Sequence, residues 1–189
     1  ILNEEMVGPS IGAELKKDAL VAILWALAII IAYIWVRFGK IGFGFGIGSV
    51  VALSHDVIIT LGIIALFGLQ VDAAIIAALL TIVGYSLNDT IVVFDRIREN
   101  TLTGRGDYAT RVNESINQSL SRTFITSFTT LFVIVALVSM GGIAVKDFAW
   151  AMLIGVVVGT YSSMFVASPF VVWWKAWRDS VNPTKITEV

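Results

Sequence analysis

The chain has 189 residues, of which 57% are hydrophobic and 14% are charged, and its formal net charge is −1. This composition excludes an ordinary soluble globular domain and is typical of an integral membrane protein. The 13 Lys and Arg and the 14 Asp and Glu are segregated along the chain, so the net charge says little about partners, and for a membrane protein we expect no nucleic-acid partner. Because the chain has no Cys, disulfides and thiolate metal sites are excluded as well.

Five segments are long and apolar enough to cross the roughly 30 Å hydrocarbon core of a bilayer as helices. We expect these spans at 19–36, 41–69, 73–94, 124–145 and 148–174. Helices are required because lipid offers the backbone no hydrogen-bond partners, and the runs are too long for barrel strands. The predicted fold is therefore an all-α bundle of five spans, with an entry segment at 1–18, a cytoplasmic loop at 95–123 and a tail at 175–189.

The Lys and Arg residues predict the orientation. With the amino-terminal end outside, ten of the 13 cations fall on the cytoplasmic side and three outside, as the positive-inside rule requires. The ten are Arg37, Lys40, Arg96, Arg98, Arg105, Arg111, Arg122, Lys175, Arg178 and Lys185; the three are Lys16, Lys17 and Lys146. Because the chain has no initiator Met or signal peptide, we expect it to be a fragment or processed product that lacks an earlier span.

The connections between the expected spans differ in length. Links at 39–40, 70–72 and 146–147 are tight, so neighbouring helices should pack antiparallel. The stretch 95–123 has room for structure of its own, and Val112, Ile116, Leu120 and Phe124 recur there at intervals of four. Two interpretations stay open: an amphipathic helix at the cytoplasmic interface, or a solvated helix packed on the bundle.

Glycines stand where the helices should touch. They form three GxxxG pairs: Gly42 with Gly46, Gly44 with Gly48, and Gly155 with Gly159. Small residues at this spacing allow two helix backbones to approach closely, so we expect packing contacts at these positions. A phosphate-binding loop is excluded because the glycines have neither a preceding strand nor the P-loop lysine.

His55 and Asp56 interrupt the second span near its middle. Adjacent residues point about 100° apart on a helix, so the pair is poorly placed to chelate one metal, and we expect no metal site. The pair either extends a proton pathway or fixes packing by hydrogen bonds, and both interpretations stay open. In the last span, Pro169 predicts a kink, with Ser162, Ser163 and Ser168 able to satisfy freed backbone groups.

Asp89 is the most informative residue, because it lies inside the third span. A charge at the bilayer centre costs about 2.5–3.5 kcal/mol on insertion scales, so such residues usually face the bundle interior and mark an ion or proton route. Asn88 and Thr90 flank Asp89 as supporting polar residues. Gly84, one turn earlier, narrows the helix there, and we expect it to pack against a neighbouring helix. We expect Asp89 to bind and release protons.

Arg122 is the candidate partner of Asp89, because it lies on the same expected cytoplasmic side at the entrance to the fourth span. The first half of that span is rich in hydroxyls, including Thr126 and Thr130. A nearby cation favours the charged carboxylate whereas burial disfavours it, so movement of Arg122 would switch proton uptake to release. The alternative is an ordinary anchor that snorkels to the interface.

Five stretches make the sequence similar to a known family. They are VGPSIGAELKKDAL, ALSHDVIITLGI, IVGYSLNDTIVVFDRIREN, SLSRTFITSFTT and LIGVVVGTYSSMFVAS. Together they closely resemble the SecF branch of the SecD/SecF protein-export membrane proteins, which are RND-like in fold. The resemblance covers nearly the whole chain and implies helices two to six of a six-helix half, preceded by the end of a periplasmic domain.

The resemblance implies partners and roles. A SecF-like protein pairs with SecD, separate or fused, and works with SecYEG and SecA to export unfolded preproteins across the bacterial inner membrane. Protons would be the coupling ion, with no other cofactor and no enzymatic activity. By motif, Asp89 is similar to the proton-responsive carboxylate of the family and Arg122 to its essential arginine, which favours the functional interpretation of Arg122. His55 and Asp56 match a less settled HD element.

Three other functions are weighed against this one. A proton-coupled RND-type exporter of small molecules or lipids would share the fold. A purely structural membrane subunit would tolerate substitution of Asp89 and Arg122. An intramembrane protease or metal hydrolase is disfavoured, because the sequence contains neither HExxH nor GxGD.

Overall fold

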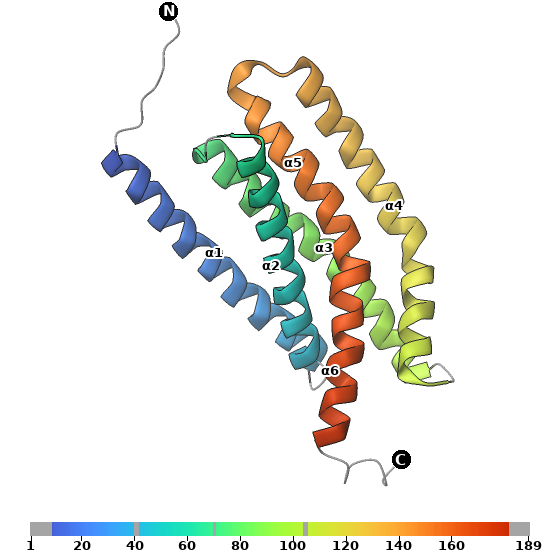
Figure 1. Ribbon diagram of the computed structural model, residues 1–189. Helices are drawn as coiled ribbons and strands as arrows, with labels where there is room; N and C mark the ends of the chain where they lie inside the picture. Colours follow the sequence, from blue (N-terminus) through green and yellow to red (C-terminus); the bar gives the residue numbers. More distant parts are fainter. Residues whose placement is uncertain (1–8, 40–41, 70, 104–105, 182–189) are drawn as a thin grey trace, which may run out of the picture.

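The computed structural model describes residues 9–39, 42–69, 71–103 and 106–181, and for 9–16, 19, 20 and 144 it describes the backbone only. The described residues form helices joined by short connections (Figure 1). The helices are α1 Pro9–Phe38, α2 Gly42–Leu66, α3 Ala73–Thr103, α4 Tyr108–Met140, α5 Ile143–Ser162 and α6 Ser168–Val181, with a π-helical turn, η2, at Ser163–Ala167. Five helical segments are long and apolar enough to cross a membrane, so the all-α transmembrane bundle is confirmed.

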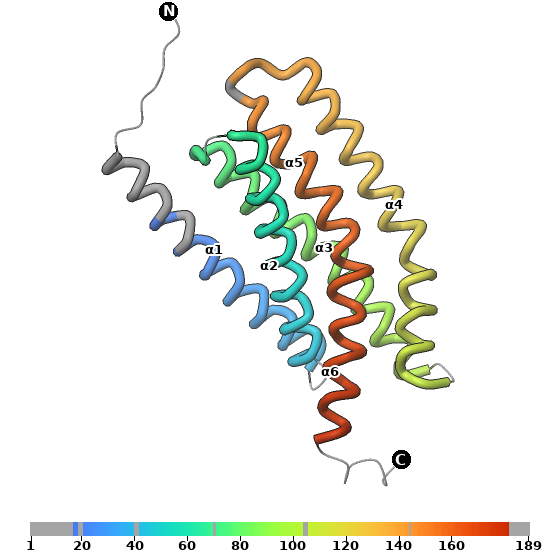
Figure 2. Tube along the Cα trace, viewed as in Figure 1, coloured from blue at the N-terminus to red at the C-terminus, as the bar shows by residue number. Residues whose placement is uncertain are grey.

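Helices α3 and α5 form the centre of the bundle and pack against each other extensively. Helix α4 packs along both of them, α2 packs on α5 and α3, and α1 leans against α2 (Figure 1). The tube in Figure 2 shows that α5, η2 and α6 follow one another as a single column through the bundle. This column and α3 are therefore the elements against which buried side chains from the other helices can meet.

Two buried apolar clusters hold the bundle together. One cluster joins α1, α2, α3, α4, η2 and α6 around Phe45 and Phe94, whose ring centroids are 4.6 Å apart in a stacked pair. Phe38 of α1 meets Phe45 edge-on at 5.1 Å, which fastens the end of α1 to the same cluster. The other cluster joins α2, α3, α4 and α5 around Ile75 and Ile82.

Glycine permits the closest helix contacts. A methyl group on Gly155 of α5 would overlap Ile82 of α3, and one on Gly159 would lie 3.0 Å from Cβ of Ser86. Gly44 and Gly48 of α2 face α6 in the same manner: a methyl group on Gly44 would lie 2.7 Å from Trp174. These contacts explain how α3, α5 and α6 approach their neighbours so closely.

Two glycine predictions are wrong. A methyl group on Gly84 would meet no atom of the described chain within 4 Å, and the residue is exposed on α3. Gly46 likewise has no such neighbour, although its GxxxG partner Gly42 lies close to the carbonyl oxygen of Ile34. A single GxxxG spacing does not say which face of the helix meets another helix. Gly84 lies on the exposed side of α3, whereas Gly46 is buried in α2 but has room at its Cβ position.

The expected loop at 95–123 is mostly helical, and this prediction is corrected. Helix α3 continues to Thr103 and α4 begins at Tyr108, so both helices extend well past the predicted span ends. The separate interfacial helix is also wrong, because 111–124 is the first part of α4. Val112 is buried and Ile116 and Leu120 pack on the apolar cluster, which agrees with a helix packed on the bundle, whereas Phe124 is exposed.

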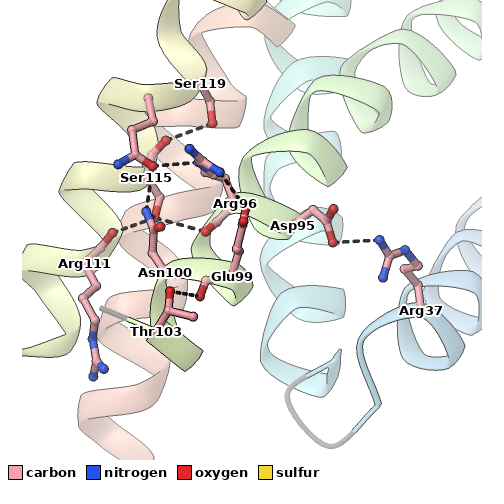
Figure 3. Close-up of polar contacts among 10 residues, drawn as sticks. Arg37, Asp95, Arg96, Glu99, Asn100, Thr103, Arg111, Ser115 and Ser119 are labelled. Atoms are coloured by element: carbon pink, nitrogen blue, oxygen red, sulfur yellow. Dashed lines mark hydrogen bonds and ion pairs between the residues drawn. The ribbon is translucent and has the colours of Figure 1, made fainter. Parts of the chain in front are cut away.

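Side-chain hydrogen bonds explain why the two helices continue together. Nδ2 of Asn100 on α3 donates to Oγ of Ser115 and to Oε1 of Gln118 on α4, at 2.9 Å each. Nε of Arg96 donates to the same Gln118 oxygen at 2.7 Å (Figure 3). These contacts pair polar segments that hydropathy alone assigns to a loop.

The last connection also differs from the prediction. The turn between α4 and α5 lies at Gly141 and Gly142, not at Lys146 and Asp147, which belong to the first turns of α5. The Gly141 N–H donates to the carbonyl oxygen of Leu137 at 2.8 Å and closes α4. The hydropathy pattern placed the turn at the charged pair, whereas the backbone turns at the two residues without side chains.

The structure places the π-helical turn η2 immediately before Pro169. Pro169 lacks an N–H, and the wider turn changes which carbonyls need partners. The hydroxyl of Ser168 donates to the Ser163 carbonyl at 3.2 Å, and that of Ser163 donates to the Thr160 carbonyl at 3.0 Å. The disturbance predicted from Pro169 therefore takes the form of a π-helical turn with serine donors.

Candidate functional site

Asp56 is the centre of a buried polar cluster that joins three helices. Its side chain on α2 is 1% exposed. Oδ2 of Asp56 accepts hydrogen bonds from Oγ of Ser86 on α3 at 2.5 Å and from Oγ of Ser162 on α5 at 2.8 Å. Buried acidic groups are stabilised when hydrogen bonds replace their lost hydration, so this cluster makes the position of α3 and α5 dependent on Asp56.

His55 completes the contacts of Asp56. Its Nδ1 lies 3.0 Å from Oδ1 of Asp56, and its side chain is 32% exposed. The structure therefore brings the two predicted residues into contact with each other. A half-exposed imidazole beside a buried carboxyl group is a chemically reasonable route for a proton between the surface of α2 and the interior.

Asp89 lies in the interior of the bundle near the middle of α3, at 4% exposure. Its Oδ2 atom is buried and has no hydrogen-bond partner among the described residues. Thr90, its neighbour, is buried and donates to the Ser86 carbonyl at 3.0 Å, whereas Asn88 points to the exposed side of α3. A buried carboxyl oxygen without a partner is unusual in folded proteins and marks a group able to take up a proton or a water.

Arg122 lies on the exposed side of α4, whereas Asp89 is buried in α3. The two side chains form no ion pair within 4.0 Å in the described part of the chain. Arg122 also lines a polar cavity of about 450 Å³ between α3 and α4, together with Asp95, Arg96 and Glu99. The described structure therefore shows Arg122 at the wall of a polar cavity and not in contact with Asp89.

Thr126 and Thr130 do not join Asp89. Their hydroxyls donate to carbonyls of their own helix, at Arg122 and Thr126 respectively, and Thr126 is exposed. The predicted supporting role of these two residues has no contact to support it. A threonine in a membrane helix can satisfy its hydroxyl locally, and composition alone does not reveal which threonines do so.

The sequence predicted a hydroxyl-rich first half of the fourth span but not which of its hydroxyls are buried. Ser127 of α4 lies 2.7 Å from Oγ1 of Thr160 on α5, and the hydroxyl of Tyr85 on α3 lies 3.5 Å from Ser127. The signal was present in the spacing of the buried hydroxyl residues along α4: Ser115, Ser119, Thr123 and Ser127. Residues four apart share one helix face, and this stripe is the face toward the bundle.

Most of the described cations belong to the parts of the helices at one end of the bundle, where α1, α3 and α6 finish and where α2 and α4 begin (Figure 1 shows these helix ends). Nη2 of Arg37 on α1 pairs with Oδ1 of Asp95 on α3 at 2.8 Å, as Figure 3 shows. Lys40, Arg105 and Lys185 lie outside the described residues, as does the side chain of Lys16. Lys17 and Lys146 belong to α1 and to the first turns of α5, away from this end.

The fold and the buried groups define a polytopic α-helical membrane protein with ionisable side chains inside its bundle. The family model for the C-terminal part of the protein export membrane proteins SecD and SecF matches residues 1–177. The chain therefore belongs to the SecD/SecF family, as its motifs predicted.

Individual relatives agree with this assignment. The chain is 49% identical to the protein translocase subunit SecF of Desulfurispirillum indicum, over 93% of this chain and 56% of that protein. It is 50% identical to the protein translocase subunit SecDF of Thermus thermophilus, over 98% of this chain and 25% of that protein.

Solved structures show the same fold. A crystal structure of the translocon-associated membrane protein SecDF from Thermus thermophilus matches with a TM-score of 0.82 and 51% identity, over 90% of this chain and 23% of that one. SecDF in its super-membrane-facing form matches with a TM-score of 0.83 and 47% identity, over 95% and 24% of the two chains. The chain thus spans about half of the SecF relative and a quarter of the SecDF relative.

Proposed function

We propose that this chain is the membrane part of a SecF subunit, which assists the export of preproteins and is driven by the proton motive force. The family membership and the names of its relatives support the role in translocation. The fused SecDF relative of Thermus thermophilus supports SecD as the partner, fused or separate. SecYEG, SecA and the unfolded preprotein are the further partners of this proposal, and no enzymatic step or other cofactor is part of it.

The proposed location is the bacterial inner membrane, with the amino-terminal end of this chain outside and its carboxyl end in the cytoplasm. The gathering of Arg37, Arg96, Arg98 and Arg178 at one end of the bundle supports this orientation. In this orientation the polar cavity beside Arg122 opens toward the cytoplasm.

Asp89 is the proton-binding group of the proposal. The observation that favours it is the buried Oδ2 atom, which has no partner among the described residues. Arg122, in the wall of the polar cavity, is the cation of the proposal. A proton that arrives from the outside neutralises Asp89 and weakens its attraction to Arg122. Release toward the cytoplasm restores the charge.

The helices would repack between the two states and tilt the part of the protein outside the membrane, which holds the emerging preprotein. The energy is sufficient in scale: one charge that crosses 100 mV is worth about 2.3 kcal/mol. Each unit of pH difference adds about 1.4 kcal/mol per proton. The hydrogen bonds that hold α3 to α2 and α5 through Asp56 are of similar strength, at about 1.5–3 kcal/mol each.

Complementation of a strain depleted of the full-length protein tests this function. Asp89→Asn and Arg122→Ala should cause unprocessed preproteins to accumulate. The control variants Asp147→Asn and Arg98→Ala also remove one carboxylate and one guanidinium, but at other positions, and should export preproteins normally. An RND-type exporter would instead lose efflux of small molecules without a preprotein defect. Normal export by Asp89→Asn at normal membrane abundance would favour a structural subunit and contradict the proton role.

A further inference from the structure

A second cavity lies at the cation-rich end of the bundle, apart from Asp56, Asp89 and Arg122. Its volume is about 200 Å³. Its lining comes from four helices and comprises Gly44, Phe45, Thr101, Tyr108, Val171, Trp174, Lys175 and Arg178. The interior of the cavity is apolar, at Phe45, Val171 and Trp174, whereas its rim holds two cations.

The rim has more positive charge than its own carboxylate neutralises. Nζ of Lys175 lies 5.4 Å from the centre of the Tyr108 ring and donates to Oδ2 of Asp179 at 2.7 Å. Nε of Arg178 is 3.9 Å from the other oxygen of Asp179, and its side chain is 54% exposed. Asp179 is therefore engaged mainly by Lys175, and the guanidinium of Arg178 remains able to bind a phosphate in bidentate fashion.

A third cation lies behind the rim. Nη1 of Arg111 on α4 donates to the carbonyl oxygen of Thr101, a lining residue, at 3.2 Å. Nε of Arg111 is buried and has no acceptor among the described residues. Buried donors are rarely left unpaired, so this side of the cavity offers a cation with unmet hydrogen-bonding capacity. Two carboxylates, Asp179 at the rim and Asp107 beside Arg111, lie near these three cations, which leaves an excess of positive charge.

Exposed aromatic residues place the mouth of the cavity at the membrane surface. Trp173 and Trp177 of α6 are 57% and 48% exposed and flank Trp174, which lines the cavity. Tryptophan and tyrosine gather at the level of lipid headgroups, where one side of the ring is apolar and the other wet. An apolar cavity with a cationic rim at this level matches an amphiphile with a negatively charged head.

We propose that this cavity binds an anionic glycerophospholipid, with its phosphate between Arg178 and Lys175 and an acyl chain against Phe45 and Trp174. Basic pockets between membrane helices at the headgroup level bind lipids of this kind. Because the lipid contacts α2, α3, α4 and α6 at once, its binding favours the arrangement in which the ends of these helices are together. The inference rests on the membrane location and not on the proton role of Asp89.

Lipid binding by the full-length protein in nanodiscs tests the inference. The nanodiscs contain phosphatidylethanolamine in excess and phosphatidylglycerol as the probe, and native mass spectrometry counts the bound lipid. Arg178→Gln should weaken phosphatidylglycerol binding about fivefold, the usual effect of one cation beside an anionic headgroup. Arg98→Gln is the matched control, because it removes the same charge at the same end of the bundle but does not line the cavity.

The control should change binding by less than about twofold, since separated surface charges are screened by salt. Equal loss in both variants would show a general surface attraction, and unchanged binding in Arg178→Gln would exclude the site; either result overturns the inference. Inorganic phosphate and an acidic peptide serve as competitors. Neither should displace the lipid, and displacement by phosphate or by the peptide would assign the rim to a free anion or to a protein partner instead.

Discussion

The hydroxyl of Ser86 donates a 2.5 Å hydrogen bond to Oδ2 of Asp56 and so fastens α3 to α2 one helical turn from Asp89. Three residues on a helix correspond to about 4.5 Å along its axis, so the proposed proton-binding group and the Asp56 cluster are near neighbours along α3. The hydroxyl of Ser162 on α5 donates to the same Asp56 oxygen, so α5 is held at this carboxyl group as well. A change in the charge of Asp89 therefore acts close to the contact that fixes three helices relative to one another.

Replacement of Ser162 by Ala should destabilise the bundle by about 1.5–3 kcal/mol, because Asp56 loses one of its buried hydrogen bonds. Thermal unfolding of the purified protein in detergent measures the change. Ser139→Ala is the control, since the hydroxyl of Ser139 is exposed and bonds only to its own helix at the Val135 carbonyl. Equal stability of the two variants would show that the Asp56 cluster contributes little to helix packing.

The contact between Gly155 and Ile82 predicts a second stability effect. Gly155→Ala should cost about 1–3 kcal/mol, because the new methyl group overlaps Ile82 and forces α3 and α5 apart. Gly62→Ala is the matched control: a methyl group there meets no described atom within 4 Å, and alanine favours a helix by roughly 0.5–1 kcal/mol. Opposite signs for the two substitutions are expected in detergent unfolding. A stabilising Gly155→Ala would disprove the close contact.

Asn100 should keep the ends of α3 and α4 together. Its amide makes two hydrogen bonds across the pair, each worth about 0.5–1.5 kcal/mol. Asn100→Ala should therefore raise backbone hydrogen exchange at the end of α3 and the start of α4 by roughly tenfold, measured by mass spectrometry. Asn113→Ala, at an exposed position on the same helix pair, should leave exchange unchanged. Unchanged exchange in Asn100→Ala would mean that apolar packing alone holds these ends.

The start of α4 should be sensitive to acid. Hydrogen bonds from Thr110, from its side chain first and from its backbone N–H second, lower the pKa of Asp107 below its ordinary value of 3.8. A carboxyl group whose pKa is lower in the folded state stabilises the fold fully above the unfolded pKa, and this stabilisation is lost as the pH falls through the folded pKa.

Melting temperatures of the native protein and Asp107→Asn, compared from neutral pH to below 3.8, check this sign. The native protein should be the more stable at neutral pH, and the difference should shrink toward zero in acid because asparagine does not titrate. A difference that grows as the pH falls would contradict the capping role of Asp107, whose Oδ1 accepts from the Thr110 N–H at 3.2 Å.

Hydropathy predicted the five spans because lipid selects for long apolar runs, and this signal needs no knowledge of the fold. It failed where helices continue into water: the ends of α3 and α4 are polar, and their pairing depends on side chains such as Asn100 and Ser115. Hydropathy reports where lipid begins, whereas a helix ends where its backbone hydrogen bonding ends.

The site was predictable in part. Asp89 and Asp56 were found because an acidic residue in an apolar span is rare and needs a reason. Their hydrogen-bond partners were not predicted. Ser162 is 106 positions from Asp56, and no local sequence pattern indicates that the two residues are in contact. Thr126 and Thr130 were expected near Asp89 on composition, but their hydroxyls bond to their own helix. Which face of α4 turns inward is decided by packing against α3 and α5.

Proton flux through the full-length protein, reconstituted with SecD in liposomes, tests the central claim most directly. An imposed proton gradient should drive a flux in the native complex that Asp89→Asn abolishes and that the control Asp147→Asn, in the first turns of α5, leaves intact, with preprotein translocation changing in parallel. If Asp89→Asn conducts protons and translocates preprotein at native rates, the buried carboxyl group of Asp89 is not the coupling site.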